Sequence, residues 1–319
     1  MAELDLLVVG DINPDLIVAG GQLEPTFNQV EQLVDRVDLV VGGSASITAI
    51  GAARLGLQVG LCGVVGDDPL GRLMVEGLAA EGIDTDRVRV DGGRTTGATV
   101  VLDRGDDRAI LTAPGCISAL GPADLDALGD QPARHVHVAS YFLMSEAFRR
   151  RLPHTFRSFR AHAATTSIDT NWDPSQQWAL SNVLDVIDVL LPNRSELVAI
   201  SGLSDPIAAL TALGAQVPTV VVKLGDQGAA AHLDGSIFSV QAPPAPSFRD
   251  SIGAGDSFNA AFLAGVLSGW SVQEAVRLAV AAGTLSTAGV GGSATQPDLV
   301  TAREFAQSLT VHPGFEGSM

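Results

Sequence analysis

The chain has 319 residues, of which 46% are apolar and 17% are charged. This length and composition are typical of a globular protein with a substantial core and exclude an intrinsically disordered chain. Asp and Glu number 36 against 19 Lys and Arg, which gives a formal net charge of −17. No basic stripe offsets the excess of acid, so we expect neither nucleic acid nor an anionic membrane as a partner.

Three further features bear on the compartment of the protein. The first residues, MAELDLLVVGD, carry acids where a secretory signal peptide has basic residues, so they predict a first strand. The uncharged stretch between Arg277 and Asp298 is rich in Gly, Ser and Thr and is not typical of a membrane span. Cys62 and Cys116 have no CxxC spacing, which favours two buried, reduced thiols. We therefore expect a cytoplasmic protein.

Along the chain, short apolar runs alternate with helical patterns. The runs that predict strands are 4–10, 59–66, 135–140, 166–170, 186–193 and 219–225. The stretches that predict helices are 44–57, 69–82 and 145–162. Continuous apolar strands suit burial on both faces. Their alternation with helices predicts an α/β fold with a parallel, doubly wound sheet.

Two regions break this alternation. Residues 95–115 predict a hairpin of two alternating strands joined at a polar Gly-Asp turn, and 15–21 and 36–43 predict two further short strands. Together they predict a small separate sheet, a lid made of approximately 13–41 and 95–115. No internal repeat or linker composition divides the chain, so we expect one domain, 1–319. The exposed apolar strands of such a lid predict a homodimer.

Polar segments follow the predicted strands, at the ends where ligands of open α/β sheets bind. They are GDINPD (10–15), GD (66–67), DTNWD (169–173), PNRSE (192–196) and KLGDQG (223–228). Two common phosphate-binding motifs are missing from the sequence, since GxxxxGK[ST] does not occur and no GxGxxG follows the first predicted strand. A Walker-type ATPase and a dinucleotide-dependent dehydrogenase are therefore disfavoured.

Two of these segments each allow two interpretations. In PNRSE, Asn193 and Glu196 would share one helical face, where an amide and a carboxylate can hold a hydrated Mg²⁺. Helix capping by Asn193, with Glu196 in the first turn, explains the same pair. In KLGDQG, Gly225 and Gly228 allow backbone close to a flat ligand such as a nucleotide base, or merely a tight turn between strands.

The stretch RDSIGAGDSFNAAFLAG (249–265) places a glycine-rich turn at the start of an apolar, alanine-rich helix. Two acids, Asp250 and Asp256, flank the turn. One interpretation is a helix cap, because aspartate accepts hydrogen bonds from free helix-terminal amides. The other is an anion hole beside a catalytic base, because the same amides attract phosphate. The motif by itself leaves both open.

Taken in order, these segments resemble the ribokinase-like carbohydrate kinases, also called the phosphofructokinase-B (PfkB) family. The segments are GDINPD, GGSASITAIGAARLG (42–56), GVVGDDPLGRLMVEGLAAEGID (63–84), PNRSE, VKLGDQG (222–228) and DSIGAGDSFNAAFLAG (250–265), covering roughly residues 5–300. The resemblance implies an α/β/α sandwich with a mostly parallel central sheet and a small β-sheet lid. It also implies transfer of the ATP γ-phosphate to a sugar-like hydroxyl, with Mg²⁺.

The resemblance implies roles for single residues. Asp256 stands where the family has its catalytic base. Three residues match the anion hole: Gly253, Ala254 and Gly255. Asn193 and Glu196 match the motif that organises Mg²⁺ and phosphate. Three residues lie on the nucleotide side: Lys223, Gly225 and Gly228. Asp250 and the backbone near Ile252 match a monovalent-cation site, for which K⁺ is the candidate ion.

On the acceptor side, the residues that match the family's sugar contacts are Asp11, Asn13, Asp15, Gly42, Gly43 and Asn171. Three positions depart from the pattern. Ile47 stands where many members have an asparagine that contacts substrate. The loss of this amide weakens a ribokinase-like recognition of the sugar, although Ile47 could face the core instead. Ser44 replaces the lysine found in members that take phosphosugars. Asp173 replaces an arginine that would suit an acidic substrate, which favours a neutral sugar or polyol.

The expected function is ATP-dependent phosphorylation of a hydroxyl on a small sugar or polyol. One alternative is a nucleoside kinase of the same fold, in which Phe27, Tyr141 or Phe142 would stack on a base. The other is a catalytically silent binding or regulatory homologue. The intact Asp256 turn argues against the silent homologue, whereas Ile47 and Asp173 keep it open.

Overall fold

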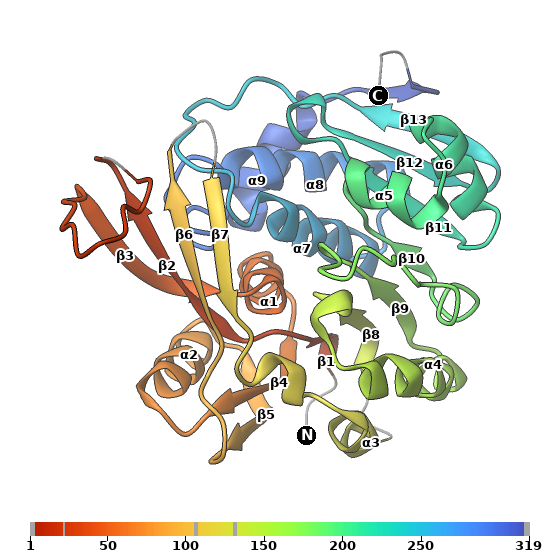
Figure 1. Ribbon diagram of the computed structural model, residues 1–319. Helices are drawn as coiled ribbons and strands as arrows, with labels where there is room; N and C mark the ends of the chain where they lie inside the picture. Colours follow the sequence, from red (N-terminus) through yellow and green to blue (C-terminus); the bar gives the residue numbers. More distant parts are fainter. Residues whose placement is uncertain (1–3, 22, 105–107, 130–132, 316–319) are drawn as a thin grey trace.

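The computed structural model describes residues 4–21, 23–104, 108–129 and 133–315. These residues form a ten-stranded sheet, a separate four-stranded sheet, and helices on both faces of the larger sheet (Figure 1). The predicted α/β fold with a mostly parallel sheet and a second, smaller sheet is confirmed.

The large sheet has all six predicted strands at its centre. In spatial order its strands are β14 (Val311–Pro313), β13 (Ser236–Val240), β12 (Ala229–Leu233), β11 (Thr219–Lys223), β10 (Val189–Leu190), β9 (Thr165–Ile168), β8 (Ala133–Val138), β1 (Leu4–Val9), β4 (Val59–Gly66) and β5 (Asp84–Asp91). The pairings from β11 to β5 are parallel, and those from β11 to β14 are antiparallel.

The strands that sequence patterns did not predict lie towards the two edges. β5 has no fully buried residue, and its sequence DTDRVRVD mixes charged residues with valine. β12 and β13 form a hairpin of small residues and short apolar runs, and β14 is only three residues long. β5 and β14 are the edge strands, and edge strands are partly solvated, so they need no continuous apolar run. β12 is buried, but its small alanine side chains do not form the pattern typical of a strand.

Helices cover the two faces of this sheet and bury two hydrophobic clusters. One face carries α1 (Ser44–Arg54), α2 (Pro69–Ala80), α7 (Ala254–Leu267), α8 (Val272–Ser286) and α9 (Leu299–Gln307). The other carries α3 (Pro122–Leu128), α4 (Glu146–Ala161), α5 (Arg194–Ser201) and α6 (Pro206–Gly214). β1 shows why both faces are needed, because Leu6 and Val8 join one cluster and Leu7 and Val9 join the other.

The small sheet contains β3 (Arg36–Gly42), β2 (Asn13–Ala19), β6 (Ala98–Asp103) and β7 (Arg108–Ala113), in that order. The predicted hairpin of β6 and β7 is confirmed, and its turn at 105–107 lies outside the described residues. Figure 1 shows the small sheet to one side of the large sheet, where β2 and β3 contact α1 and α2. Asn13 and Asp15 share one face of β2, and Leu16 and Val18 lie on the other.

Three short 3₁₀ helices complete the described secondary structure: Ile117–Ala119, Tyr141–Leu143 and Gly225–Gln227. Cys62 and Cys116 are buried and unpaired, as predicted. In the described ranges no single helix is long and apolar enough to span a membrane. Only α5 with α6, a pair bent by 66°, reaches that length and composition together.

Candidate active site

The turn before α7 is built around a glycine that no other residue could replace without strain. Gly253 caps the helix with a φ of +69°, and a Cβ atom there would lie 2.4 Å from the Cα of Gly292. The Ala254 amide donates to the Ser251 carbonyl across 3.3 Å. The Gly255 amide belongs to the first helical turn, where amides have no partner within the helix. The turn therefore aims the positive end of α7 outwards.

Asp256 follows in the first turn of α7 and is 8% exposed. Burial, together with the nearby Asp169 carboxylate, raises the pKa of Asp256 well above its usual range. The charge of Lys223 and a hydrogen bond from Ser44 act in the opposite direction on this pKa. A carboxyl group with a raised pKa takes up a proton more readily than an exposed one, which suits a general base.

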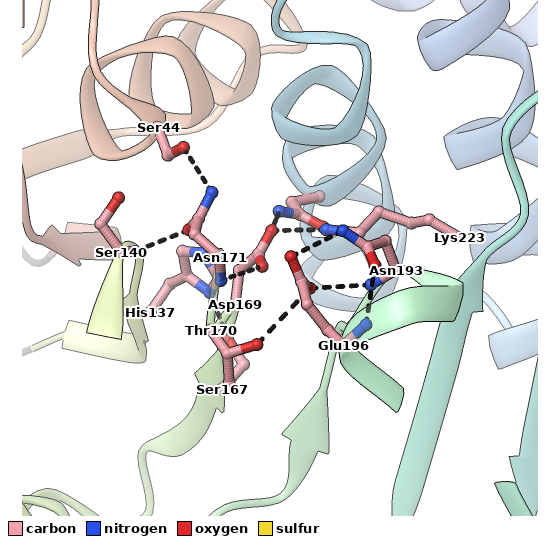
Figure 2. A network of polar contacts seen from close by, with 11 residues as sticks. Ser44, His137, Ser140, Ser167, Asp169, Thr170, Asn171, Asn193, Glu196 and Lys223 are labelled. Atoms are coloured by element: carbon pink, nitrogen blue, oxygen red, sulfur yellow. Dashed lines mark hydrogen bonds and ion pairs between the residues drawn. The ribbon is translucent and has the colours of Figure 1, made fainter. Parts of the chain in front are cut away.

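Lys223, at the end of β11, lies in the middle of a polar network (Figure 2). Its Nζ donates to the carboxylate of Asp169 and, across 3.4 Å, to Oδ1 of Asn259. The Nδ2 of Asn259 donates to the same Asp169 oxygen. Despite burial, the Asp169 and Glu196 carboxylates raise the pKa of Lys223, so it carries a positive charge.

At the start of α5, Asn193 and Glu196 form a capping box. The Asn193 side chain accepts from the Glu196 amide at 2.9 Å, and Glu196 accepts from the Asn193 amide at 2.9 Å. Burial and the Asp169 carboxylate raise the pKa of Glu196 to about 7. The capping interpretation is therefore confirmed. Capping is compatible with the predicted role of the pair in binding Mg²⁺, because the Glu196 carboxylate also interacts with Lys223 of the polar network.

Beside this network lies a pocket of about 560 Å³. Its lining includes Lys223, Gly225, Gly228 and Gly255, together with apolar side chains from the loop before α7 and from α8. Gly228 has a φ of +91°, and a Cβ atom there would lie 2.1 Å from the Val240 carbonyl oxygen. The tight turn needs this glycine, and the turn forms one wall of the pocket. The turn interpretation of KLGDQG is therefore confirmed, and the contact of its backbone with a flat ligand stays a prediction.

Near Asp11, residues of β2 and β3 gather around two glycines. A Cβ atom at Gly42 would lie 2.1 Å from the Asp15 carboxylate carbon, and one at Gly43 would lie 2.9 Å from Asn13 Oδ1. Asn13 donates to Thr99 Oγ1 at 3.1 Å, while its buried Oδ1 has no partner among the described residues. Burial, followed by the charges of Asp11 and Asp250, raises the pKa of Asp15 to about 7.

Asp11 and Asn171 are also brought here, but their side chains already have partners. The Asp11 carboxylate accepts from the amides of Ser44 and Ala45, both at 3.1 Å, and so caps α1. Asn171 donates to Ser44 Oγ and accepts from the Ser140 amide, both at 2.8 Å (Figure 2). Contact of Asp11 and Asn171 with the sugar-like substrate stays a prediction. Both residues hydrogen-bond to Ser44 and so hold it in place.

Two arguments drawn from the sequence change. The Asp173 carboxylate is 1% exposed and accepts from Ser175, Gln177 and Trp178 of its own loop, so its oxygens are engaged there. Ile47 faces the protein interior, since a Cβ atom at Gly292 would lie 2.3 Å from its Cδ1. Ile47 therefore faces the core, and repulsion of an acidic substrate by Asp173 stays a prediction.

The candidate cation site at Asp250 and Ile252 has a basic neighbour. Asp250 accepts from the amides of Ile252 at 2.8 Å and Gly291 at 3.0 Å. Arg108 of β7 lies 3.8 Å from Asp250 and donates to Ser251 Oγ at 2.9 Å. An arginine of the small sheet thus partly neutralises the carboxylate to which the resemblance assigns a cation.

Sequence patterns did not single out Asn259 or Arg108 as parts of the site, and they marked Ser44 only as a departure from the family's lysine. Asn259 carried one usable signal, because it lies three residues after Asp256 and therefore on the same helical face. The contacts of Ser44 with Asn171 and of Arg108 with Ser251 carried none, since these partners are far apart in the chain. Within the described ranges, no three His, Cys, Asp or Glu side chains are arranged to hold a metal ion by themselves.

Comparison with known proteins agrees with this geometry. Residues 3–299 match the model of the pfkB family of carbohydrate kinases. A fructokinase of Klebsiella pneumoniae is 32% identical over 237 residues, covering 70% of this chain and 76% of that protein. A 2-dehydro-3-deoxygluconokinase of Thermoproteus tenax is also 32% identical, over 282 residues, covering 84% and 86%.

Solved structures show the same fold. Arabidopsis thaliana ribokinase, solved with ribose and ATP, has a TM-score of 0.84 and 25% identity over 96% of this chain and 99% of that one. An Escherichia coli ribokinase II, solved with ATP and Mg²⁺, has a TM-score of 0.83 and 23% identity over 95% and 99%. The predicted resemblance is confirmed: the chain belongs to the pfkB family of carbohydrate kinases and is a sugar kinase.

Proposed function

We propose that this chain transfers the γ-phosphoryl group of ATP to a hydroxyl of a small neutral sugar or polyol, with Asp256 as the general base and 253–256 as the anion hole. The observation that carries the proposal is the position of Asp256. It is a buried carboxyl group with a raised pKa that directly follows Gly255, which lines the 560 Å³ pocket, and it lies close enough to Asp11 and Ser44 for both to act on its pKa. That is where an acceptor hydroxyl would meet a nucleotide.

In this mechanism Asp256 accepts the proton of the acceptor hydroxyl while the hydroxyl oxygen bonds to the γ-phosphorus. The bond from that phosphorus to the β,γ-bridging oxygen breaks, and its electron pair leaves with ADP. Phosphoryl transfer of this kind depends on positioning and on stabilisation of charge. The first-turn amides of α7 supply part of that stabilisation at the open face of the turn.

The donor side fits ATP with Mg²⁺. The pocket is lined mainly by apolar side chains and glycines, as expected for a base and ribose, and it reaches Lys223 and Gly255 at the anion hole. Mg²⁺ would be held through water by Asn193 and Glu196, because it takes few protein ligands beside phosphate oxygens. When bound, it neutralises the charge that develops on the phosphates. The similar structures solved with ATP support this donor.

The acceptor side favours an uncharged polyhydroxyl compound. Asp15 and the unpartnered Asn13 Oδ1 are acceptors that sugar hydroxyls can satisfy. The Asp11, Asp15 and Asp250 carboxylates raise the negative potential there, which disfavours a carboxylate or a phosphosugar. Tyr141 and Phe142 are buried in the second hydrophobic cluster, so neither can stack on a nucleoside base.

We also propose that the small sheet is a lid over the acceptor, because it carries Asn13 and Asp15 and is joined to the anion-hole loop by Arg108.

The K⁺ site at Asp250 and Ile252 stays a prediction. Measuring the rate in KCl against choline chloride tests it. Stimulation by K⁺ alone supports a bound ion, and equal rates support neutralisation by Arg108 without one.

The experiment for the activity uses purified protein, ATP, Mg²⁺ and a panel of sugars, polyols and nucleosides, with ADP formation as the readout. We expect turnover with at least one neutral sugar or polyol. Asp256→Asn should lose at least ~10²-fold in kcat, because a positioned base contributes about 10²–10⁴, while its affinity for ATP stays unchanged. A near wild-type kcat in this variant would remove Asp256 from the base role.

A further inference from the structure

Of the 19 basic residues in the chain, Lys223 is the one lysine, and the other 18 are arginines. Lysine presents a compact ammonium with three donors, whereas arginine presents a planar fork. A chain that uses arginine at every other basic position therefore has a specific requirement at 223. We infer that position 223 requires a compact ammonium, which fits a confined space, rather than a guanidinium.

The space is the floor of the anion hole. The Lys223 side chain is 13% exposed and lines the 560 Å³ pocket. A Cβ atom at Gly255 would lie 3.7 Å from both Cδ and Nζ of Lys223, so the lysine runs directly beside the helix-terminal amides. The glycine at 255 leaves the ammonium open to a group bound at the turn.

Two groups hold the ammonium there. Asp169, after β9, accepts from Nζ, and Asn259, on α7, both accepts from Nζ and donates to the same Asp169 oxygen. Asn259 lies one helical turn after Asp256, so the clamp and the proposed base are on one rigid element. In the described part of the chain, Nζ has these two acceptors, and an ammonium has three donors.

The charges around Lys223 also favour a cation that is held in place at the turn. The Asp169, Glu196 and Asp256 carboxylates all act on this single cation. A phosphoryl group entering the turn adds more negative charge to a buried region. A preformed cation aimed at that point needs no rearrangement during the reaction, which is what makes such groups effective.

We propose that the Lys223 ammonium meets the phosphoryl group during its transfer, and that Asp169 and Asn259 are positioning residues that hold it beside Gly255. The inference rests on the proposed function and deepens it. The phosphorus–oxygen bond to ADP breaks as the bond to the acceptor oxygen forms, and the acceptor proton goes to Asp256. Lys223 gives and takes no proton, and its third N–H faces the oxygens of the group in transfer. Lys223 also lines the pocket proposed for ATP, and we expect its contribution to fall mainly on kcat rather than on the binding of the nucleotide.

The first test reads Lys223 directly and needs no acceptor. Protein made with lysine labelled with ¹⁵N at the side chain shows one Nζ signal, because the chain has one lysine. We expect Mg²⁺ with ADP to leave this signal in place, and the further addition of AlF₄⁻, which mimics the phosphoryl group in transfer, to shift it. A signal that stays unmoved in both states would show that Lys223 only pairs with Asp169, and would overturn the proposal.

The second test separates kcat from KM. Lys223→Met should lose about 10²–10³-fold in kcat, the range for one preorganised donor, with KM for ATP within about 3-fold of wild type. Arg72→Met is the matched control, because it removes one exposed cation on α2 and should keep the full rate. A rise in KM for ATP without loss of kcat, or an equal loss in the control, would contradict the proposal.

Lys223→Met leaves the buried Asp169 charge without its partner and can fail to fold. The double variant Lys223→Met/Asp169→Asn removes both charges and keeps the size of both side chains. It should show the same loss of kcat in a protein with wild-type circular dichroism. Asn259→Ala should lower kcat and broaden the Nζ signal. A wild type that phosphorylates no acceptor refutes the proposed function, whereas an active wild type with full activity in the double variant refutes only this inference.

Discussion

Asp256 is a carboxyl group whose neighbours pull its pKa in opposite directions. Burial and Asp169 raise the pKa, and Lys223 and Ser44 lower it. In the proposed mechanism only the ionised form can accept the proton of the acceptor. Its neighbours therefore decide the pH at which the enzyme becomes active. The 249–265 motif predicted the acid at the helix start, but Ser44, more than two hundred residues away, could be connected to it only by the fold.

The pH profile checks this arrangement. Since the pKa of Asp256 is raised, kcat/KM for the acceptor should fall as the pH drops through that raised value, well above the usual range of a carboxyl group. Ser44→Ala removes a hydrogen bond that lowers the pKa, so its acid limb should lie at higher pH than that of wild type, with the plateau rate reduced less than 10-fold. An acid limb at the same pH in both proteins would show that Ser44 does not tune Asp256.

At the scale of elements, the important connection is between the small sheet and the loop before α7. β2 carries the acceptor residues Asn13 and Asp15, and β7 carries Arg108, which bonds to Ser251. The strands of the hairpin were predictable from their alternating pattern, because alternation is a local property. The contact of Arg108 was not, because Ser251 lies 143 positions later in the chain.

Arg108→Met should therefore weaken the attachment of the small sheet to the loop before α7 and so lower the affinity for the acceptor substrate. A charge-assisted contact that is partly exposed is worth about 1 kcal/mol, so we expect KM for the acceptor to rise about 3–10-fold. Steady-state kinetics at saturating ATP measures this, and the affinity for ATP should not change. Arg104→Met is the control, because Arg104 starts from the same hairpin and pairs with Glu24 at the surface. An equal effect of both variants would contradict a specific role for Arg108.

At the scale of the whole molecule, the outer face of the small sheet is apolar and open. Cross-strand registers place two rows of side chains on the face opposite Asp15: Leu39, Leu16, Val100 and Leu111 in one row, and Val37, Val18, Leu102 and Ala109 in the other. Val37, Leu39 and Leu111 are each at least half exposed. A continuous apolar surface of this kind marks an interaction site.

We predict that this face joins two copies of the chain. Sedimentation velocity should give the mass of two 32.8 kDa chains, and Leu39→Asp should give one. Val300→Asp on α9 is the control, because it adds the same charge at an exposed apolar residue far from the small sheet and should stay dimeric. A wild type that sediments as a single chain at micromolar concentration would overturn the prediction.

The sequence by itself determined the central strands, the helices α1, α2 and α4, the starts of α5 and α7, the four strands of the small sheet and the order of the site motifs. These follow from local properties: apolar runs, alternation, capping residues and glycines in turns. Only the tertiary structure decided how the polar side chains are used. In the folded chain Asp173 accepts hydrogen bonds from its own loop, and Asn171 donates to Ser44. Lys223 donates to both Asp169 and Asn259. The partners of Asn171 and Lys223 lie tens of residues away in the chain, whereas those of Asp173 lie within its own loop. In each case a buried polar side chain bonds to the groups that the fold brings beside it.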